Sequence, residues 1–170
     1  MNRRLLILPL LMFCLASLAQ DTPHSAEQLK KVHPKVQWHL DSATSIDIDC
    51  DGRPDTFYWG LDPEVSHTYY YDKKNHTFSY PEISLGFEFA NDAKPQKINI
   101  PFLKNTGYYG FRSEPKTIEV QPLACDWEGG TIPGCLKKDR CESMWIRDGQ
   151  GFEAFVFWDA ERKQVGWIRH

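Results

Sequence analysis

Four aspartates, Asp47, Asp49, Asp51 and Asp55, crowd nine consecutive positions in the stretch DIDCDGRPD. Carboxylates this close repel one another unless something neutralises them. Alternating acids in a tight loop can point their oxygens at one centre, and Gly52 permits the sharp turn that such a loop needs. Carboxylate and carbonyl oxygens are the ligands that a hard divalent cation prefers. The stretch therefore predicts a calcium site.

The spacing of these acids follows that of known calcium loops. Counted from Asp47, acids fall at positions 1, 3, 5 and 9 and a glycine at position 6, as in an EF-hand. Position 12 is Tyr58 instead of a bidentate glutamate, and strand-like sequence follows instead of a helix. The pattern resembles the Asp-x-Asp-x-Asp-Gly-x-x-Asp loops of FG-GAP and VCBS-type extracellular β domains. The resemblance implies these ligands: Asp47, Asp49, Asp51, the Arg53 carbonyl at position 7, and Asp55.

Two other interpretations of the acidic stretch compete with a calcium site. It can be a solvated turn that binds nothing, but each acid falls on a ligand position. It can also be a catalytic carboxylate cluster, but general acid and base pairs need separated, differently tuned environments. Four acids in one tight loop fit a cation better. With about five ligands and no glutamate, we expect a weak site with a Kd of ~10⁻⁴–10⁻³ M.

The N-terminus has the pattern of an export signal. Arg3 and Arg4 precede an apolar run from Leu5 to Leu15, and small residues up to Ala19 follow. The run is too short to span a bilayer, which argues against an uncleaved anchor. We expect a signal peptide over residues 1–19 and a single exported domain, periplasmic or secreted, over residues 20–170.

The charge and hydropathy of the remaining chain argue against nucleic acid and membrane as partners. Without the signal, 18 basic and 23 acidic residues remain, a net charge of −5. No basic patch stands out, so nucleic acid is a poor candidate partner. No other segment is apolar enough to cross a membrane, so we expect no membrane association after signal removal.

Four cysteines remain after the predicted cleavage, and an even count in an exported chain predicts two disulfides. The turn-rich segment between Cys125 and Cys135 can bring its ends together, which leaves Cys50 to pair with Cys141. Pairing of Cys135 with Cys141 is the close alternative. A zinc site is disfavoured, because no Cys-x-x-Cys pair occurs. Cys50 itself departs from the calcium-loop pattern, where that position is commonly glycine, asparagine or apolar.

The hydrophobic pattern predicts an all-β fold with one short helix. Ser25 and Gln28 have the spacing of a capping box, and a helix to about Val32 would end before Pro34 as a surface element. From residue 35 on, the apolar period is two, which indicates strands in an antiparallel sandwich, barrel or small propeller. The alternating strand residues are Leu85, Phe87 and Phe89; Ile98, Ile100 and Phe102; Ile118 and Val120; Phe155 and Phe157.

Two segments have a similar hairpin pattern. Residues 69–80 and 156–168 each place an aspartate after an aromatic residue and an apolar residue six positions later, as Asp72 with Phe78 and Asp159 with Val165. An aspartate at a turn entry can accept hydrogen bonds from nearby backbone N–H groups. The two segments can belong to an internal repeat of about 85–90 residues, or they can be ordinary hairpins, which we favour.

Outside the acidic stretch, the sequence offers aromatic loops instead of catalytic motifs. The six histidines are scattered, and no Gly-x-Ser-x-Gly, Walker loop or His-Glu-x-x-His occurs. A Gly-flanked stretch over residues 105–115 is rich in the residue types that anchor protein interfaces, although its rings can equally cap the core. The candidate partner-binding residues are Tyr108, Tyr109, Phe111 and Arg112, together with Trp127 in the Cys125–Cys135 segment.

A second resemblance bears on function. Small disulfide-bonded β domains exported by bacteria include periplasmic lysozyme inhibitors and immunity proteins, and the YYD and FWD hairpins look like theirs. Thr106-Gly107-Tyr108-Tyr109 shares the character of the inhibitors' Ser-Gly-x-x-Tyr-like loop but not the motif itself. The resemblance implies a binding protein that inhibits a lysozyme-like cell-wall hydrolase. The alternative is a secreted hydrolase of cell-wall or carbohydrate substrates, with its carboxylates outside the calcium loop.

Overall fold

The computed structural model describes residues 26–71, 73–91, 93–102, 110–127, 130–132, 134–135 and 141–169. The predicted signal peptide and Ser25 lie outside these residues. The elements are α1 (Glu27–Val32), β1 (Gln37–Ile46), β2 (Asp55–Tyr71), β3 (Lys74–Glu88), β4 (Gln96–Pro101), β5 (Thr117–Pro122), β6 (Asp126–Trp127), β7 (Gly130–Thr131), β8 (Glu142–Arg147), β9 (Glu153–Asp159) and β10 (Gln164–Arg169).

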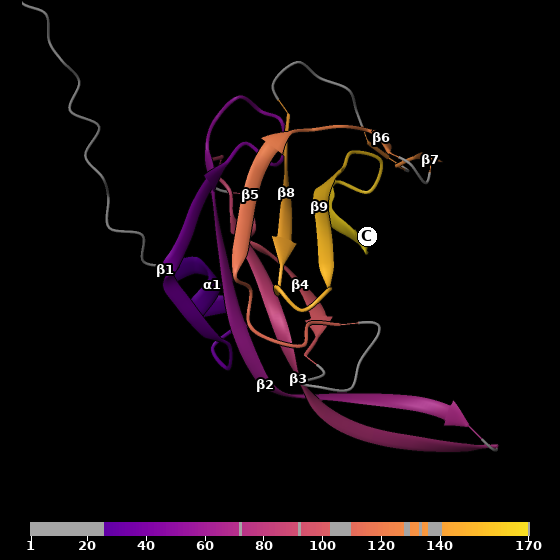
Figure 1. The fold of residues 1–170 in the computed structure, drawn as a ribbon. Coiled ribbons are helices and arrows are strands. Elements are labelled where there is room, and N and C mark those ends of the chain that lie inside the picture. The colour runs from indigo at the N-terminus through magenta and orange to yellow at the C-terminus, as the bar shows by residue number, and fades with distance from the viewer. Residues whose placement is uncertain are drawn as a thin grey trace, which may run out of the picture.

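The strands form two four-stranded antiparallel sheets, each a meander in chain order (Figure 1). The first sheet has the order β1-β2-β3-β4 and the second the order β10-β9-β8-β5. A two-stranded sheet of β6 and β7 lies outside both. This confirms the prediction of a mostly antiparallel all-β fold with one short helix, and the arrangement is that of a sandwich.

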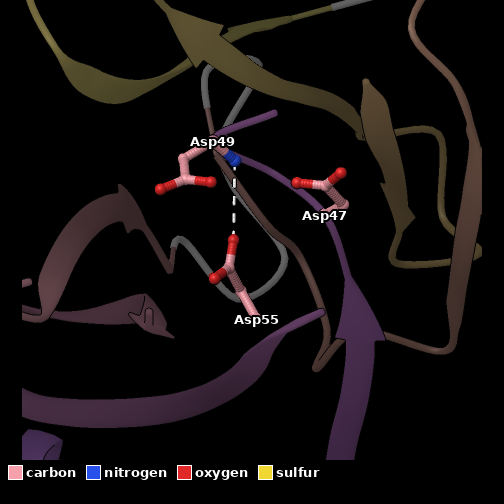
Figure 2. Close-up of side chains that lie close together, drawn as sticks. All are labelled: Asp47, Asp49 and Asp55. Carbon is pink, nitrogen blue, oxygen red and sulfur yellow. Dashed lines mark hydrogen bonds between the residues drawn. The ribbon is translucent and has the colours of Figure 1, made fainter. Parts of the chain in front are cut away.

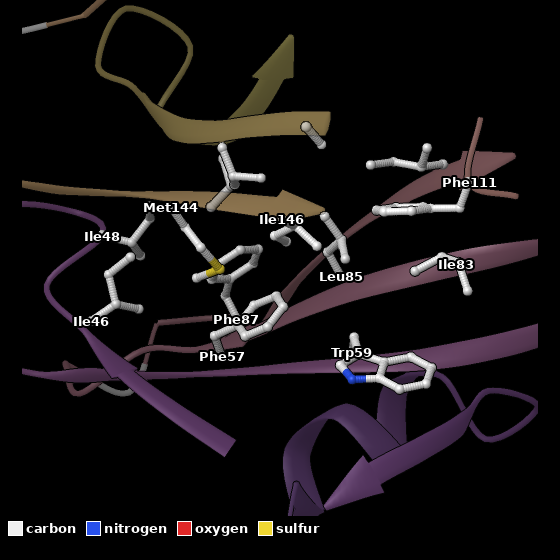
Figure 3. Packing of buried hydrophobic residues seen from close by; sticks show 14 of the residues in the cluster. Ile46, Ile48, Phe57, Trp59, Ile83, Leu85, Phe87, Phe111, Met144 and Ile146 are labelled. Atoms are coloured by element: carbon white, nitrogen blue, oxygen red, sulfur yellow. The ribbon is translucent and has the colours of Figure 1, made fainter. Parts of the chain in front are cut away.

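The core fills the space between the two sheets (Figure 3). Cross-strand pairs such as Phe57 with Phe87 and Trp59 with Leu85 put the apolar residues of β2 and β3 on one face, as the period of two predicts. Met144, on β8, lies on the facing side of the same core. Apolar burial between the sheets is therefore the main stabilising contribution to the fold.

The outer face of the first sheet is covered by α1. Leu29 is fully buried there, close to Gly86 and Trp38. A Cβ on Gly86 would lie 2.7 Å from Leu29 Cδ1 and 2.6 Å from Trp38 Cη2, so glycine is needed for this approach. The helix ends before Pro34 as predicted, but its Leu29 is part of a second apolar cluster, so α1 is not merely a surface element. Ala26 occupies the N-cap position without a side-chain cap.

The outer face of the second sheet is covered by the segment that contains the short disulfide. Phe155 and Phe157 are buried against Ile132, with Leu123 and Cys135 packed beside them. Ala154 and Val156, which alternate with them along β9, belong to the main core. β9 is therefore buried on both faces, which explains why apolar residues fill consecutive positions there and weaken its alternation.

Both predicted hairpins form, at different places in the two meanders. Tyr71 pairs with Lys74 at the end of the β2–β3 hairpin, and Asp72 in that turn lies outside the described residues. Asp159 ends β9, and its Oδ1 accepts hydrogen bonds from the backbone N–H groups of Glu161 and Arg162 at 3.1 and 3.0 Å. One hairpin joins the second and third strands of its sheet and the other the third and fourth, which favours ordinary hairpins over a repeat.

A buried carboxylate fixes the turn between β8 and β9. Asp148 Oδ1 accepts hydrogen bonds from the N–H groups of Gln150 and Phe152 at 2.7 and 3.0 Å. Asp148 Oδ2 accepts one from the Arg112 N–H at 2.8 Å, which ties the segment after residue 110 to this turn. Burial by itself would raise the pKa of Asp148, but these backbone hydrogen bonds outweigh it and hold the pKa below its ordinary value.

Two disulfides close loops of very different length. Cys50 is bonded to Cys141 across 91 positions, and Cys125 to Cys135 across 10. These are the pairs of the first connectivity considered above, and Cys135 does not pair with Cys141. The long bridge joins the loop before β2 to the start of β8, and thus one sheet to the other.

The two bridges should differ in their effect on stability. Replacing Cys50 and Cys141 with serine removes a constraint on a long loop of the unfolded chain, and we expect it to lower the free energy of unfolding by about 3–5 kcal/mol. The same replacement of Cys125 and Cys135 should cost roughly 2 kcal/mol less, because loop entropy grows with the logarithm of length. Urea unfolding of both variants measures this, and equal losses would contradict it.

Replacing Asp148 with asparagine should give a pH-dependent loss of stability. Because the pKa of Asp148 is lower in the folded state, its contribution is present above the unfolded pKa of about 3.8 and is lost as the pH falls through the folded value. We expect Asp148→Asn to lower the free energy of unfolding by about 2–3 kcal/mol at pH 7 and the difference to shrink below pH ~4. The exposed Asp41→Asn is the control, and a pH-independent loss at Asp148 would contradict the assignment.

Candidate metal centre

The acidic loop connects β1 to β2 and is shaped by two left-handed residues. β1 ends at Ile46, and β2 begins at Asp55. Cys50 has φ 66° and Gly52 has φ 86°, so the chain turns sharply at both positions. No side chain contacts a Cβ built at Gly52, so backbone conformation and not crowding explains this glycine. The turn folds the acids back towards the start of β2.

Three of the four aspartates converge (Figure 2). Asp47, Asp49 and Asp55 each offer one carboxylate oxygen, and these oxygens lie within 4.8 Å of one another. Asp47 Oδ2 accepts a hydrogen bond from the Gly52 N–H at 3.0 Å. Its other oxygen, Oδ1, is buried and has no hydrogen-bond donor among the described residues. A buried carboxylate oxygen without a donor is costly, and a cation would satisfy it.

Asp55 is the buried member of this group. Its side chain accepts hydrogen bonds from the N–H groups of Ala90 at 2.9 Å and Ile48 at 3.2 Å, with a longer contact to the Asp49 N–H at 3.5 Å. Burial raises the pKa of Asp55 to about 6, and the nearby Asp49 charge adds to the rise against the opposing effect of the backbone hydrogen bonds. Asp55 is only 1% exposed.

The pKa of Asp47 is raised for similar reasons. Burial raises its pKa above the ordinary value, and the charges of Asp49 and Asp51 add to this rise. Two of the three converging acids are thus held where the protein disfavours their charged form. A divalent cation bound between them would stabilise the ionised carboxylates that these residues would offer as ligands.

Asp51 lies apart from this group. Its carboxylate pairs with the Arg53 guanidinium, with Nη2 to Oδ2 at 2.7 Å, and also accepts the Arg53 backbone N–H at 2.8 Å. The hydrogen bond from the Arg53 side chain is the main cause that lowers the pKa of Asp51. The structure therefore separates the predicted ligands: Asp47, Asp49 and Asp55 come together, while Asp51 is neutralised by Arg53. The sequence predicts the backbone carbonyl of Arg53, not its side chain, as a ligand. Besides pairing with Asp51, the Arg53 guanidinium lies 3.4 Å from the Ala90 carbonyl oxygen.

Asn91 is a contributor that the sequence did not single out. It lies in the turn after β3, and its side-chain Nδ2 donates to Asp49 Oδ2 at 2.8 Å and to Asp51 Oδ2 at 3.2 Å. Its Oδ1 accepts the Ala93 N–H at 3.0 Å. An amide N–H between two carboxylates partly offsets their repulsion. Asparagine after a strand is a common turn signal, and no local pattern connects it to acids 40 positions earlier.

The loop is also anchored to the second sheet. The Asp47 N–H donates to Glu142 Oε2 at 2.8 Å, and the Glu142 N–H donates to the Asp47 carbonyl at 3.2 Å. The adjacent Cys141 carries the disulfide to Cys50. Covalent and hydrogen-bonded links therefore hold the acids at the junction of the two sheets. A rigid support of this kind preserves ligand geometry better than a free loop would.

The predicted partner-binding residues are distributed differently. Tyr108 and Tyr109 lie outside the described residues, and only the backbone of Trp127, in β6, is described. Phe111 is fully buried and packs edge-on against Phe152, with ring centroids 4.7 Å apart. The alternative interpretation, a ring that caps the core, thus describes Phe111. Arg112 is partly exposed, and its guanidinium lies 3.3 Å from the Gln150 carbonyl oxygen.

Comparison with known proteins assigns no family to the chain. No protein-family model, no curated protein and no solved structure matches the chain.

Proposed function

We propose that this chain is an exported binding protein whose fold is stabilised by one calcium ion in the loop over residues 47–55. The observation that carries the metal assignment is the convergence of Asp47, Asp49 and Asp55, whose oxygens lie within 4.8 Å of one another, beside the buried Oδ1 of Asp47 that has no donor among the described residues. Oxygen ligands alone suit Ca²⁺ better than the transition metals, which prefer nitrogen or sulfur.

The proposed location is the periplasm or the extracellular space. Disulfides such as Cys50–Cys141 and Cys125–Cys135 persist in oxidising compartments. Over its described part, the structure has no helix with the length and apolarity needed to cross a membrane. Millimolar calcium is typical of extracellular fluids, which suits a weak site of the kind proposed.

The proposed partner is a protein, a lysozyme-like cell-wall hydrolase that this chain inhibits. Support comes from the rigid scaffold: two packed sheets, two disulfides and an anchored loop leave surface elements pre-organised, which lowers the entropic cost of binding. The acids of the 47–55 loop are engaged in the proposed metal site, in the pair with Arg53 and in backbone hydrogen bonds, so they are poor candidates for general acid and base catalysis. The alternative, a secreted hydrolase, remains an outcome of the assay below.

Calcium should stabilise the protein through the three converging acids. For a Kd of ~10⁻⁴–10⁻³ M, ~10 mM CaCl₂ adds about 1.5–2.5 kcal/mol to the free energy of unfolding. For a chain of this size that is a rise in Tm of roughly 3–10 °C over the same protein in EDTA. Thermal unfolding by circular dichroism measures the shift, and an equal amount of MgCl₂ should give a smaller one because Mg²⁺ demands stricter geometry.

Matched variants assign this shift to the loop. We expect Asp49→Ala to abolish the calcium-dependent rise in Tm. Asp51→Ala, in the same loop but paired with Arg53, should keep most of it. A shift of the same size in wild type and Asp49→Ala would refute the metal site.

The inhibitor assignment has a direct enzymatic test. The purified mature chain is mixed with purified lysozymes and a lytic transglycosylase, and clearing of a peptidoglycan suspension is followed. We expect clearing by at least one of these enzymes to be lost at equimolar inhibitor. If the chain itself clears the suspension, the hydrolase alternative replaces the proposed function; if it affects no enzyme, the inhibitor assignment is wrong.

A further inference from the structure

A cavity lies where the chain turns from α1 into β1. The helix ends at Val32, Pro34 prevents its continuation, and the Val36 N–H donates to the His33 carbonyl at 3.2 Å. The cavity has a volume of about 250 Å³ and is lined by this turn of residues 32–36, by Asp62 and by Lys97. Segments from the α1–β1 turn, from β2 and from β4 therefore meet around one cavity, which we call the turn cavity.

A larger depression adjoins the turn cavity. It has a volume of about 590 Å³, and Lys35 and Asp62 line both spaces. Pro63 and Ser66, farther along β2, line only the larger one. A ligand held in the turn cavity can therefore continue into open space beside β2, so the site suits the end of a longer molecule as well as a small one.

One side of the turn cavity is apolar. Val32, Pro34 and Val36 contribute to its lining. Val32 is 41% exposed, although valine is among the residues most often buried. Ligand sites typically combine an apolar lining of this kind with a few polar groups that fix the orientation of the ligand. A small apolar substituent would cover the exposed surface of Val32.

The polar residues of the turn cavity offer more hydrogen-bond donors than acceptors. Lys97 Nζ contacts Asp62 Oδ2 at 3.3 Å, and the two side chains are only 17% and 13% exposed. An ammonium group has three N–H donors, so two of them have no acceptor among the described residues. In the same part of the chain, the side chains of His33 and Lys35 have no hydrogen-bond partner either. The cavity thus lacks acceptors that a ligand could supply.

The electrostatic potential at the turn cavity favours an anion. Burial lowers the pKa of His33, and the charges of Lys97 and Lys94 lower it further, while Asp62 opposes them more weakly. Glu82 pairs with Asp62 in the register, but it is buried and lines neither space. The positive charges near His33 therefore outweigh the negative one, on a chain whose net charge is −3.

We propose that the turn cavity binds a carboxylate that carries a small apolar substituent, such as the free carboxyl end of a peptide. Its oxygens would accept hydrogen bonds from Lys35, Lys97 and His33, and its substituent would contact Val32. This inference depends on neither the proposed calcium site nor the proposed inhibition of a hydrolase.

The donor set favours a carboxylate over a phosphate. Lys97 is already shared with Asp62, which leaves Lys35 as the one lysine of the lining outside an ion pair among the described residues. A single negative charge matches this supply better than a dianion does. Phosphate sites commonly use arginine forks or the N–H groups of a helix N-terminus. The turn cavity has no arginine in its described lining and lies at the C-terminal end of α1.

Binding of N-acetyl-alanyl-alanine tests the proposal, with the same peptide as its C-terminal amide for the uncharged control. At the ligand efficiency usual for small molecules, we expect a Kd of about 1 mM for the acid and binding at least tenfold weaker for the amide. Calorimetry measures both affinities. The bound carboxylate should also raise the pKa of His33, because it favours the charged imidazolium, and NMR titration of the imidazole resonances measures that change.

Two variants locate the binding. Lys35→Gln should weaken binding of the acid about tenfold or more, whereas Lys74→Gln, at an exposed lysine on β3 with the same change in charge, should bind as wild type does. Lys35 is exposed, so we expect both variants to keep the Tm of wild type.

The remaining outcomes overturn the proposal. If acid and amide bind equally, or if neither binds, the cavity is not a carboxylate site. The same holds if Lys35→Gln binds the acid as tightly as wild type, or if the pKa of His33 does not change on saturation. If inorganic phosphate binds more tightly than the peptide and displaces it, the anion is a phosphate and the carboxylate assignment is wrong. None of these results bears on the calcium-dependent rise in Tm or on the clearing assay, which test the proposed function separately.

Discussion

The loop architecture depends on the backbone hydrogen bonds that the Asp55 carboxylate accepts. Asp55 is the first residue of β2. Its carboxylate accepts hydrogen bonds from the backbone N–H of Ile48, in the acidic loop, and from that of Ala90, after β3. The acidic loop, the start of β2 and the distant turn after β3 therefore meet at one buried group. The arrangement carries an electrostatic cost, because burial beside other acids disfavours the charge that these hydrogen bonds favour. A cation at this place would remove the conflict, and the neighbouring acids already lie within reach.

Much of this arrangement could be predicted because it follows from local rules. The period of two in the β3 and β4 segments identifies half-buried strands, and the structure pairs Leu85 with Ile98 and Ile83 with Ile100. The turn-rich segment after Cys125 brought its ends together as its composition indicated. Asp47, Asp49 and Asp55 converge as the spacing of acids and glycine in this short loop indicates.

The remaining features depend on side-chain contacts that residue spacing does not reveal. Asn91 joins the acidic loop only because β3 and the turn after it return to the start of β2. Asp51 follows the ligand spacing, but the neighbouring Arg53 supplies an alternative partner that a spacing rule ignores. Phe111 belongs to a segment whose composition fits an interface or a core, and its contact with Phe152, 41 positions away, decides between them. Long-range packing determined the positions of Asn91 and Phe111, and a local ion pair determined that of Asp51.

The part of the β2–β3 hairpin that extends past β1 and β4, residues 65–80, affects the behaviour of the protein in solution. Two open strand edges are templates for the addition of a strand from another molecule, the first step towards aggregation. Here an added strand would meet β1 along one edge and β4 along the other, and Pro63 and Pro81 offer no N–H at the base. Edge pairing is therefore confined to about seven residues next to two lysines. The fold thus limits the length of open strand edge along which another molecule could add a strand.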